Sequence, residues 1–446
     1  MSQSVRILLI NAINTSVENE TRYPGLGLGY LVSYARKYLP GFNISFKIID
    51  RRIRETTQSF KPHLVGISSV SQNFGTVIRL CGYFDSLDIP VILGGIHITS
   101  LPECLPKNVP LACLGESEAT FVRVVKLFVE DKLKTEYLRD IPGIAFREAD
   151  TVRITPPAEQ LDNLDFLPMP ARDLLRIKSH TYVYSSRGCP YRCIFCSSTR
   201  FWNQVRFFSA DYVIDEIEHL KKHYKVQMIS FLDDLFIADT TRLEEILKGL
   251  EKKGLIGKIK FTCSCRANLV DKEIADLLSR MGVVSVGMGL ESGNQATLRY
   301  LKQNVDVEQN SKAIETLKNA GIYTNGSFII GSPQETQEQI LETYRFIKKS
   351  RLDLFDISLL TPLPNTPLWQ TALEKKLVST DMNWNKLNMN PYHHPENVLS
   401  LSDVLEKKHL IQLYKKFRRL RFLRNLSKIW QHPMRVDIPK MMVSLF

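Results

Sequence analysis

The sequence predicts an α/β protein in which a doubly wound parallel sheet is followed by a partial (β/α)6 barrel and a short C-terminal helical tail. Three observations support this fold class. Short apolar strands alternate with helical patterns over residues 1–135, a proline-rich connector over 156–170 interrupts them, and the alternation resumes from Tyr182. Strands that alternate with helices favour parallel sheets with right-handed crossovers, and prolines mark boundaries. We therefore expect two domains built on parallel strands.

The first domain, over residues 1–140, is expected to be a Rossmann- or flavodoxin-like sheet. Its expected strands are Val5–Ile10, Ile44–Ile49, Leu64–Ser68, Val91–Gly94 and Ala112–Leu114, and its helices are Leu26–Tyr38, Phe74–Ser86 and Glu118–Glu130. Such sheets bind ligands beyond the carboxyl ends of their strands. The residues expected at those ends, and therefore at a binding site, are Pro24, Gly25, Ser68, Ser69, Gly94, Gly95 and Glu116.

The barrel is expected over residues 176–375, after a hairpin and the proline-rich linker over 141–175. Its expected strands are Val183–Ser186, Met228–Leu232, Lys260–Ser264, Val284–Leu290, Thr324–Ile330 and Asp356–Thr361, with helices over 211–223, 240–253, 271–281, 307–320 and 335–350. Six strand–helix units suit a partial barrel better than a second open sheet. Barrel enzymes carry their chemistry at the carboxyl ends of the strands. Residues 376–446 form the C-terminal helical region.

The composition is that of a folded, water-exposed protein. Hydrophobic residues make up 44% of the 446 residues and charged residues 24%, which is ordinary for a globular chain. No apolar run approaches the roughly 18 residues that span a bilayer. The opening run Val5–Ile10 is too short for a secretion signal and lacks a cleavage site. We therefore expect a cytoplasmic protein, in which a disulfide framework is a poor explanation of the eight cysteines.

Three of these cysteines form the most specific motif in the chain. Cys189, Cys193 and Cys196 stand in a loop after the first expected barrel strand, with Phe195 before the third. Soft thiolates favour iron–sulfur or zinc centres. Three thiolates hold three irons of a 4Fe–4S cluster and leave the fourth iron open, whereas a structural zinc site takes four protein ligands. Cys263 or Cys265 could supply a fourth zinc ligand, but both lie in a separate expected strand.

The spacing resembles the Cys-x-x-x-Cys-x-aromatic-Cys motif of the radical S-adenosylmethionine superfamily. The resemblance implies that the open iron chelates the amino and carboxylate groups of S-adenosylmethionine. It also implies contacts from Asp233 and Asp234 to the methionine amino group, the alternative being a helix cap. By the same resemblance Arg266, beside Ser264, pairs with the cofactor carboxylate, the alternative being a structural salt bridge.

The resemblance extends to the last strands of the barrel. Glu291 would be costly to bury without a partner, so contact with the cofactor or the substrate is expected. Ile330 and Gly331 would flank the adenine, the alternative being plain strand core. Among these residues, Glu291 and Arg266 are the expected catalytic ones.

Within this superfamily, a doubly wound domain before the barrel commonly binds cobalamin. The resemblance therefore assigns the turn residues of the first domain, listed above, to cobalamin. Many cobalamin proteins place a histidine after the second strand as the lower cobalt ligand, but here Arg51 and Arg52 stand in that segment. An arginine offers no lone pair to cobalt. These arginines are expected beneath the corrin or beside its phosphate. The resemblance also counts His97, which follows Gly95, among the cobalamin-binding positions, and this histidine is expected to form a local hydrogen bond and not to ligate cobalt.

The resemblance implies a cobalamin-dependent radical enzyme that methylates an unactivated carbon of a small-molecule or lipid-like substrate, through methylcobalamin and a 5′-deoxyadenosyl radical. An external electron donor of flavodoxin or ferredoxin type is the expected protein partner. Radical cyclisation or carbon–carbon coupling is the alternative within the enzyme class. A zinc protein that binds nucleic acid is the alternative outside it.

The C-terminal region carries much of the net charge of +12, because nine Lys or Arg and no acid lie between Lys407 and Lys428. Apolar residues recur there at helical spacing. They are Leu410, Leu413, Phe417, Leu420, Leu423, Leu426 and Trp430. One interpretation is a helix packed on the barrel with a solvated basic face. The other is peripheral attachment to an anionic membrane, and RNA binding is a third.

Overall fold

The computed structural model describes residues 4–13, 24–389, 397–428, 431 and 433. The chain forms two compact units. The first comprises Met1–Ile177 with Val378–Asn385, and the second comprises Lys178–Leu377 with Lys386–Phe446.

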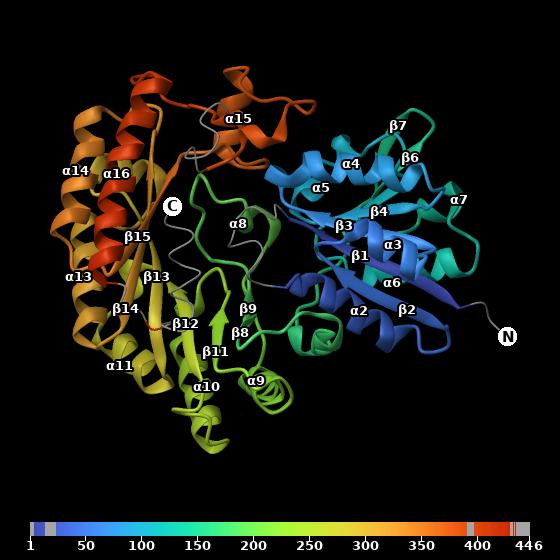
Figure 1. Cartoon of the computed structure of the whole chain (residues 1–446), viewed down its shortest axis with the longest axis horizontal. Helices are drawn as coiled ribbons and strands as arrows, with labels where there is room; N and C mark the ends of the chain where they lie inside the picture. Colours follow the sequence, from blue (N-terminus) through green and yellow to red (C-terminus); the bar gives the residue numbers. More distant parts are fainter. Residues whose placement is uncertain (1–3, 14–23, 390–396, 429–430, 432, 434–446) are drawn as a thin grey trace. The chain divides into compact units, whose positions relative to one another are not determined.

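The first unit is built on a seven-stranded sheet in the order β2-β1-β3-β4-β5-β6-β7 (Figure 1). The strands are β1 (Val5–Ala12), β2 (Ile44–Ile49), β3 (Leu64–Ser69), β4 (Val91–Gly94), β5 (Leu111–Cys113), β6 (Ile144–Glu148) and β7 (Thr151–Ile154). The first five pair in parallel, and β6 and β7 add an antiparallel edge. The expected doubly wound sheet is confirmed. The hairpin expected in the linker is part of this sheet.

Helices cover both faces of this sheet. They are α2 (Leu26–Tyr38), α3 (Ile53–Phe60), α4 (Phe74–Asp85), α5 (Ile96–Ser100), α6 (Glu118–Val129) and α7 (Thr135–Leu138). Figure 1 shows α4 and α5 on one side of the strands and α2 on the other, and α2 packs beside α6. The helix α3 was not expected, because its sequence is polar and only Thr57 is buried in it.

The core of the first unit lies between β1 and the α2–α6 face of its sheet. Four consecutive residues of β1, Ile7 to Ile10, are buried, and Ile7 and Leu9 pack with Val32 of α2 and Phe121 of α6. Continuous burial is the pattern expected of a strand that is covered on both faces, because successive side chains point to opposite sides. The short segment Val378–Asn385 also belongs to this unit, where Trp384 packs edge-on against His97.

The second unit is built on six parallel strands in the order β15-β14-β13-β12-β11-β8. They are β8 (His180–Val183), β11 (Met228–Phe231), β12 (Lys260–Cys265), β13 (Val283–Glu291), β14 (Tyr323–Ile330) and β15 (Leu354–Leu359). The spatial order follows the order along the chain, and β8 and β15 form the two edges, as in a partial barrel. The predicted fold class is confirmed.

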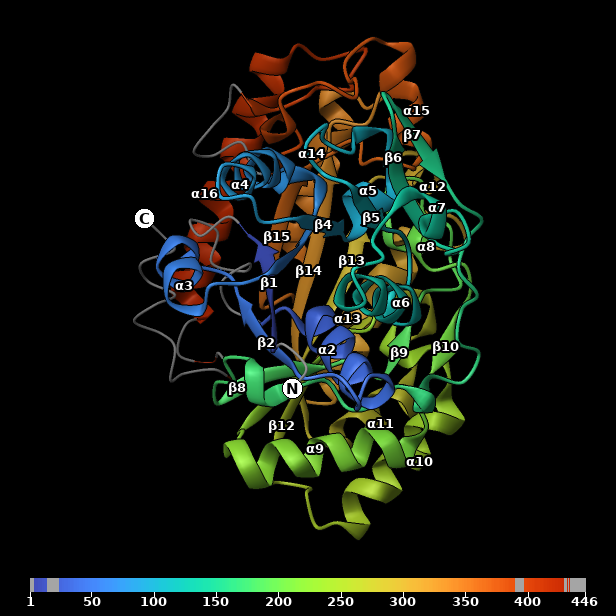
Figure 2. The same cartoon turned by 90° about the vertical axis from the view of Figure 1, so that its right-hand side faces the viewer.

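The helices of the second unit begin at capping residues that the sequence supplies. They are α8 (Ser198–Phe201), α9 (Ala210–Tyr224), α10 (Thr240–Lys252), α11 (Lys272–Met281), α12 (Gln295–Leu301), α13 (Val307–Asn319), α14 (Gln337–Lys349), α15 (Pro367–Glu374) and α16 (Lys407–Lys428). Side chains such as Asp239, Asp306 and Thr336 accept hydrogen bonds from the first helical turn. Figure 2 shows α9 and α10 side by side along one end of the strands.

The first barrel strand differs from the expectation. It ends at Val183, and Ser186–Arg187 forms a separate short strand, β9, that pairs antiparallel with β10 (Arg206–Phe207). The cysteine loop therefore lies between β9 and α8, in an excursion from the barrel, and does not follow β8 directly. The reason is a long-range contact: the carboxylate of Asp233, after β11, binds the backbone amides of Ser185 and Ser186.

The tail helix α16 packs on the barrel. Its side chains Leu410, Leu413, Tyr414 and Phe417 are buried, against β15 and α14. Farther along the helix, Leu423 is 57% exposed and Leu426 is 46% exposed. The packed-helix interpretation therefore holds for the first half of α16, while Trp430 lies outside the described residues.

Candidate active site

The cysteine loop begins at a glycine that its geometry requires. Gly188 has φ +90°, and a Cβ at this position would meet the carbonyl oxygen of Gln204 at 2.5 Å. The three thiols that follow, those of Cys189, Cys193 and Cys196, are free and half-buried. A tight turn joins them, since the amide of Cys196 donates to the carbonyl of Cys193 over 3.2 Å.

The donor chemistry of the loop fits a metal cluster. Burial raises the pKa of the Cys189 thiol to about 11 and also raises the pKa of Cys196, so neither is a thiolate on its own at neutral pH. Metal binding favours the thiolate, because the metal replaces the proton. No three His, Cys, Asp or Glu side chains in the described parts of the chain converge closely enough to ligate one metal ion. A 4Fe–4S cluster does not need such convergence, because each thiolate binds a different iron.

Arg266 lies directly against this loop. It follows β12 and is 5% exposed, with its guanidinium 3.7 Å from the ring centre of Tyr191 and 3.6 Å from the Cys193 sulfur. Its remaining donors bind Asn268, over 2.8 Å, and the carbonyl of Gln303. Arg266 thus brings a positive charge to the cysteine loop. Within the described residues Arg266 forms no salt bridge, because the hydrogen-bond partners of its guanidinium are an amide side chain, a backbone carbonyl and a thiol.

The two aspartates after β11 hold the cysteine excursion from both ends. Asp233 is 3% exposed and binds the amides of Ser185 and Ser186 over 2.7 and 3.2 Å. Asp234 is exposed and accepts from the hydroxyl of Ser198, at the start of α8, over 2.8 Å. The helix-cap alternative was wrong for both, since the residue that caps α10 is Asp239. Their expected contact with the methionine amino group stays a prediction.

Glu291 ends β13 in a strained conformation. Its φ of +58° is rare for a residue with a side chain, and the pairing of β13 with β14 shifts register at this point. The side chain is 7% exposed, and its carboxylate lies 3.5 Å from the ammonium of Lys302, which is 6% exposed. Burial raises the pKa of Glu291, and the charge of Lys302 opposes that rise.

A second buried carboxylate, Glu335, was missed by the sequence analysis. It accepts hydrogen bonds from the amides of Gly331 and Ser332, over 2.7 and 3.1 Å. Burial raises its pKa to about 7. The sequence feature that could have indicated Glu335 is its position four residues after Gly331, a glycine with φ +91° in the turn that follows β14. Of the predicted neighbours, Ile330 is fully buried and Ser264 is a half-buried residue of β12.

In the first unit, the structure brings together two of the predicted binding segments. Gly95 has φ +94°, and a Cβ there would meet the Ser68 hydroxyl at 2.7 Å and the Ser69 amide at 2.8 Å. Ser68–Ser69 and Gly94–Gly95 therefore touch at the carboxyl ends of β3 and β4. The next strand end is Gly115–Glu116. A Cβ on Gly115 would meet no atom within 4 Å, and the amide of Gly115 donates to the Thr99 hydroxyl over 2.9 Å. Pro24 and Gly25 precede α2, after β1.

The arginines that follow β2 offer no lone pair to a metal. Arg51 forms an ion pair with Asp50 over 2.7 Å, and Arg52 is 77% exposed in a left-handed conformation before α3. Arg52 lines a pocket of about 450 Å³ beside Arg54, Arg79 and Tyr83. Whether either arginine lies near a bound corrin stays a prediction.

His97 forms the local hydrogen bond that was expected. Its Nδ1 lies 3.0 Å from the hydroxyl of Ser71, and its ring is enclosed by Phe74 and Trp384 at centroid distances of 3.8 and 4.4 Å. Burial lowers the pKa of His97 to about 3, so the ring is neutral at physiological pH.

Comparison with known proteins shows the family to which the chain belongs. Residues 183–347 match the family model of the radical SAM superfamily. An uncharacterized methyltransferase of Pyrococcus horikoshii is 33% identical over 390 residues, which cover 82% of each chain. An anaerobic magnesium-protoporphyrin IX monomethyl ester cyclase of Cereibacter sphaeroides is 30% identical over 293 residues, covering 63% of this chain and 48% of the cyclase.

Among solved structures, the radical S-adenosylmethionine methyltransferase TsrM of Kitasatospora setae, with cobalamin and a [4Fe-4S] cluster bound, has the same fold. The TM-score is 0.67 at 18% identity, over 83% of this chain and 76% of that one. The chain belongs to the radical SAM superfamily, as the cysteine motif indicated. It is therefore an enzyme of this class, and the expected family is confirmed.

Replacement of Cys189, Cys193 and Cys196 together by Ala should remove the iron and abolish formation of 5′-deoxyadenosine, because these thiols are the ones available at the loop. Iron content and product formation would be measured after anaerobic reconstitution. Replacement of the buried Cys81 and Cys113, which lie in the first unit, is the matched control and should leave iron content unchanged. A triple variant that still binds about four irons would show that the cluster site lies elsewhere.

Proposed function

We propose that this enzyme is a cobalamin-dependent radical methyltransferase that modifies an unactivated carbon of a small-molecule or lipid-like substrate. The observation that carries the proposal is the combination of a three-thiol loop, which leaves one iron of a cluster open, with a separate doubly wound unit. The methyltransferase relative matches 82% of the chain, a span that reaches well beyond the radical SAM region.

The barrel residues suit the binding of S-adenosylmethionine, which carries an ammonium, a carboxylate and a sulfonium. Arg266 can attract the carboxylate, because its guanidinium faces the cysteine loop. Glu291 can accept hydrogen bonds from donors of the cofactor, because its partner Lys302 leaves part of the carboxylate uncommitted. Opposite charges on two strand ends would orient the cofactor along the carboxyl edge of the sheet.

The first unit suits a large planar ligand. Small residues end β3 and β4, so the backbone there is not covered by bulky side chains. A Cβ on Gly115, after β5, would meet nothing within 4 Å. When bound, cobalamin would supply the methyl group and the cluster would supply the electron that cleaves S-adenosylmethionine. The protein's own part is to hold these groups and exclude water from the substrate. An external flavodoxin- or ferredoxin-type protein would supply the electrons.

The bound cobalamin is expected to be base-off, with neither a protein histidine nor its own dimethylbenzimidazole on the lower face of the cobalt. Arg51 is paired with Asp50, an arginine such as Arg52 offers no lone pair, and His97 is enclosed by aromatic rings with a hydrogen bond to Ser71. The electron paramagnetic resonance spectrum of the cob(II)alamin form should show no superhyperfine splitting from an axial nitrogen. Nitrogen splitting that disappears in His97→Ala would show that His97 is the ligand and would contradict this expectation.

Methyl transfer can be distinguished from cyclisation without the substrate. A methylating enzyme consumes one S-adenosylmethionine as methyl donor, so the reconstituted protein with methyl-labelled S-adenosylmethionine and a reductant should form S-adenosylhomocysteine and label its corrinoid. Chromatography of the products provides the measurement, and protein reconstituted without cobalamin is the control. Formation of 5′-deoxyadenosine with no S-adenosylhomocysteine would favour the cyclase alternative. One of the similar proteins described above is a cyclase.

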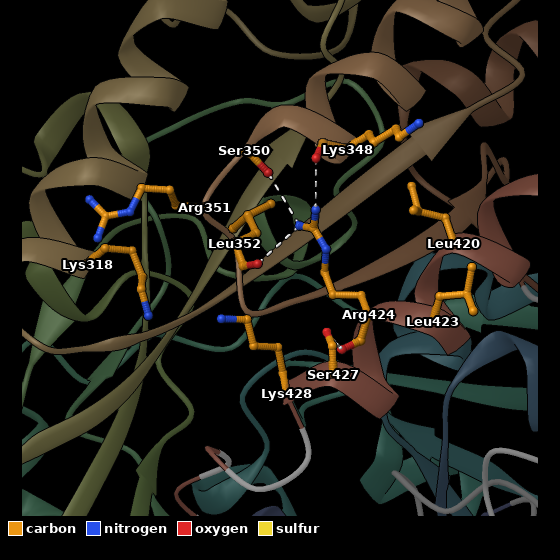
Figure 3. A pocket seen from close by; sticks show the side chains of 10 residues that line it. All are labelled: Lys318, Lys348, Ser350, Arg351, Leu352, Leu420, Leu423, Arg424, Ser427 and Lys428. Carbon is orange, nitrogen blue, oxygen red and sulfur yellow. Dashed lines mark hydrogen bonds between the residues drawn. The ribbon is translucent and has the colours of Figure 1, made fainter.

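A second proposal, peripheral contact with an anionic membrane, is supported by the far half of α16. There Leu423 and Leu426 are exposed, and Leu423 lines a pocket of about 470 Å³ (Figure 3). Its lining contains five cationic side chains and no acid: Lys318, Lys348, Arg351, Arg424 and Lys428. The two acids that contact them, Asp353 and Glu315, leave the group net positive. No helix in the described ranges is long and apolar enough to cross a bilayer.

Not all of this charge is available to a membrane. Arg424 reaches from α16 to the end of α14, where it donates to the carbonyl of Ile347 over 2.8 Å. It also donates to the carbonyl of Leu352, which follows α14, over 3.1 Å (Figure 3). Lys348 is exposed, and its ammonium extends away from Arg424 (Figure 3). Exposed leucines together with an exposed cation such as Lys348 are typical of a surface that binds the membrane interface.

Removal of the exposed groups should weaken binding to anionic vesicles and leave the fold intact. Leu423→Ser with Leu426→Ser should reduce binding to phosphatidylserine vesicles on the order of tenfold through lost apolar burial, and Lys348→Gln should reduce it about fivefold. Vesicle sedimentation provides the measurement. Ile256→Ser, at a residue 37% exposed elsewhere, is the control. Equal binding by all variants would support a helix that only packs on the barrel.

A further inference from the structure

Three consecutive residues that neither the motifs nor the expected site included contact three parts of the site. They are Leu301, the last residue of α12, and Lys302 and Gln303, which follow it. We call them the 301–303 segment. The carbonyl of Leu301 accepts from the amide of Ile194, inside the cysteine loop, over 3.3 Å. The carbonyl of Gln303 accepts from Arg266.

The middle residue, Lys302, is held entirely inside the protein. Its side chain is 6% exposed, and its ammonium contacts the carbonyl of Gly289 and the carboxylate of Glu291. A buried ammonium is costly without such partners. Both partners belong to the end of β13, where the register shifts and Glu291 adopts φ +58°. Lys302 therefore bridges the two sides of this irregular turn.

The local chain explains why the segment is placed there. Asn294 caps α12 and donates to Glu342 over 2.7 Å, so the start of the helix is fixed to α14. The amide of Lys302 closes the last helical turn on the carbonyl of Leu298 over 2.8 Å. Lys302 then leaves the helix in an extended conformation, with φ −151°. The backbone beyond the helix is thereby turned toward Arg266 and the cysteine loop.

We infer that Lys302 is a positioning residue for S-adenosylmethionine binding, which acts by keeping Glu291 charged and correctly oriented, and that the 301–303 segment couples Glu291 and Arg266 to the cysteine loop. The inference rests on the proposed role of Glu291 and Arg266 in contacting the cofactor. A carboxylate that is strained and buried needs a fixed partner, because either loss of its charge or rotation of its side chain would remove the acceptor.

Two charged groups surround Glu291 and set its protonation. Lys302 and Arg266 both lower its pKa against the rise that burial causes. Without Lys302 the pKa of Glu291 should rise further, so a larger share of the carboxyl is protonated at neutral pH. Raising the pH should then restore the carboxylate. A purely structural role for Lys302 would produce no such dependence.

The experiment uses the reconstituted full chain with its cluster. Lys302→Met retains the apolar stem and removes the charge, and it should keep its iron while binding labelled S-adenosylmethionine about tenfold more weakly at neutral pH, with part of the loss recovered at higher pH. Equilibrium dialysis provides the dissociation constants. Glu291→Gln should weaken binding independently of pH. The double variant should lose no more than Glu291→Gln alone, because Lys302 acts through Glu291.

A second buried ion pair of the barrel supplies the matched control. Asp353 is 1% exposed and pairs with Lys318 over 2.8 Å, at the amino end of β15. Asp353→Asn should lower the thermal unfolding midpoint but leave the affinity for S-adenosylmethionine and its pH dependence unchanged. If Lys302→Met behaves in the same way, Lys302 is a stability residue and the inference is overturned.

The outcomes also separate this inference from the proposed function. Reconstituted wild-type protein that binds neither cluster nor S-adenosylmethionine would overturn both. Wild-type binding that is weakened by Glu291→Gln but not by Lys302→Met would overturn the inference alone. Additive losses in the double variant would likewise contradict action through Glu291. As a further readout, addition of S-adenosylmethionine should alter the cluster's electron paramagnetic resonance spectrum in the wild type, and in Lys302→Met only at higher cofactor concentration.

Discussion

A charge that is buried at the carboxyl edge of the barrel sheet must have a partner, and much of the site is arranged by this requirement. Glu291 is balanced by Lys302, and Asp233 is satisfied by backbone amides before the cysteine loop. The amide of Ser185 lies 48 residues before Asp233, and Lys302 lies 11 residues after Glu291, beyond α12. The charges therefore fix the loops that carry them, and the ends of several strands become one surface on which a zwitterionic cofactor can be oriented.

The cysteine loop shows the consequence of that arrangement. It departs from the barrel through β9 and β10 and is held at Ser185–Ser186 by Asp233, at Ser198 by Asp234, and at Ile194 by the carbonyl of Leu301. Fixed backbone on both sides of the thiols limits how far they can move. Half-buried thiols with raised pKa values also have a strong electrostatic reason to bind a metal, because a cation relieves the cost of forming thiolates at this depth.

The basic tail shows how composition can mislead about function. A run of nine cations without an acid suggests a surface for an anionic partner, yet several of these side chains are used inside the barrel unit. Arg424 donates to the carbonyl of Ile347 in the last turn of α14 and to the carbonyl of Leu352 after the helix, and Arg421 pairs with Asp356 over 2.7 Å. The exposed cations of α16 are Lys408, Lys415, Lys416 and Arg419, while Leu423 and Leu426 are exposed at its far end and Lys348 is exposed on α14.

The sequence by itself determined the fold class and the family, because these depend on local patterns. Strand Ile44–Ile49 and helix Leu26–Tyr38 were predicted at their observed bounds, and the cysteine spacing is a property of a few consecutive residues. Only the tertiary structure decided the roles of Asp233, Lys302 and Glu335. The partners of Asp233 lie before the cysteine loop, those of Lys302 lie at the end of β13, and those of Glu335 lie in the Gly331 turn. The burial that makes these partners necessary exists only after the sheet has formed. The polar helix α3 and the early end of β8 were missed for the same reason, since neither is set by hydrophobic periodicity.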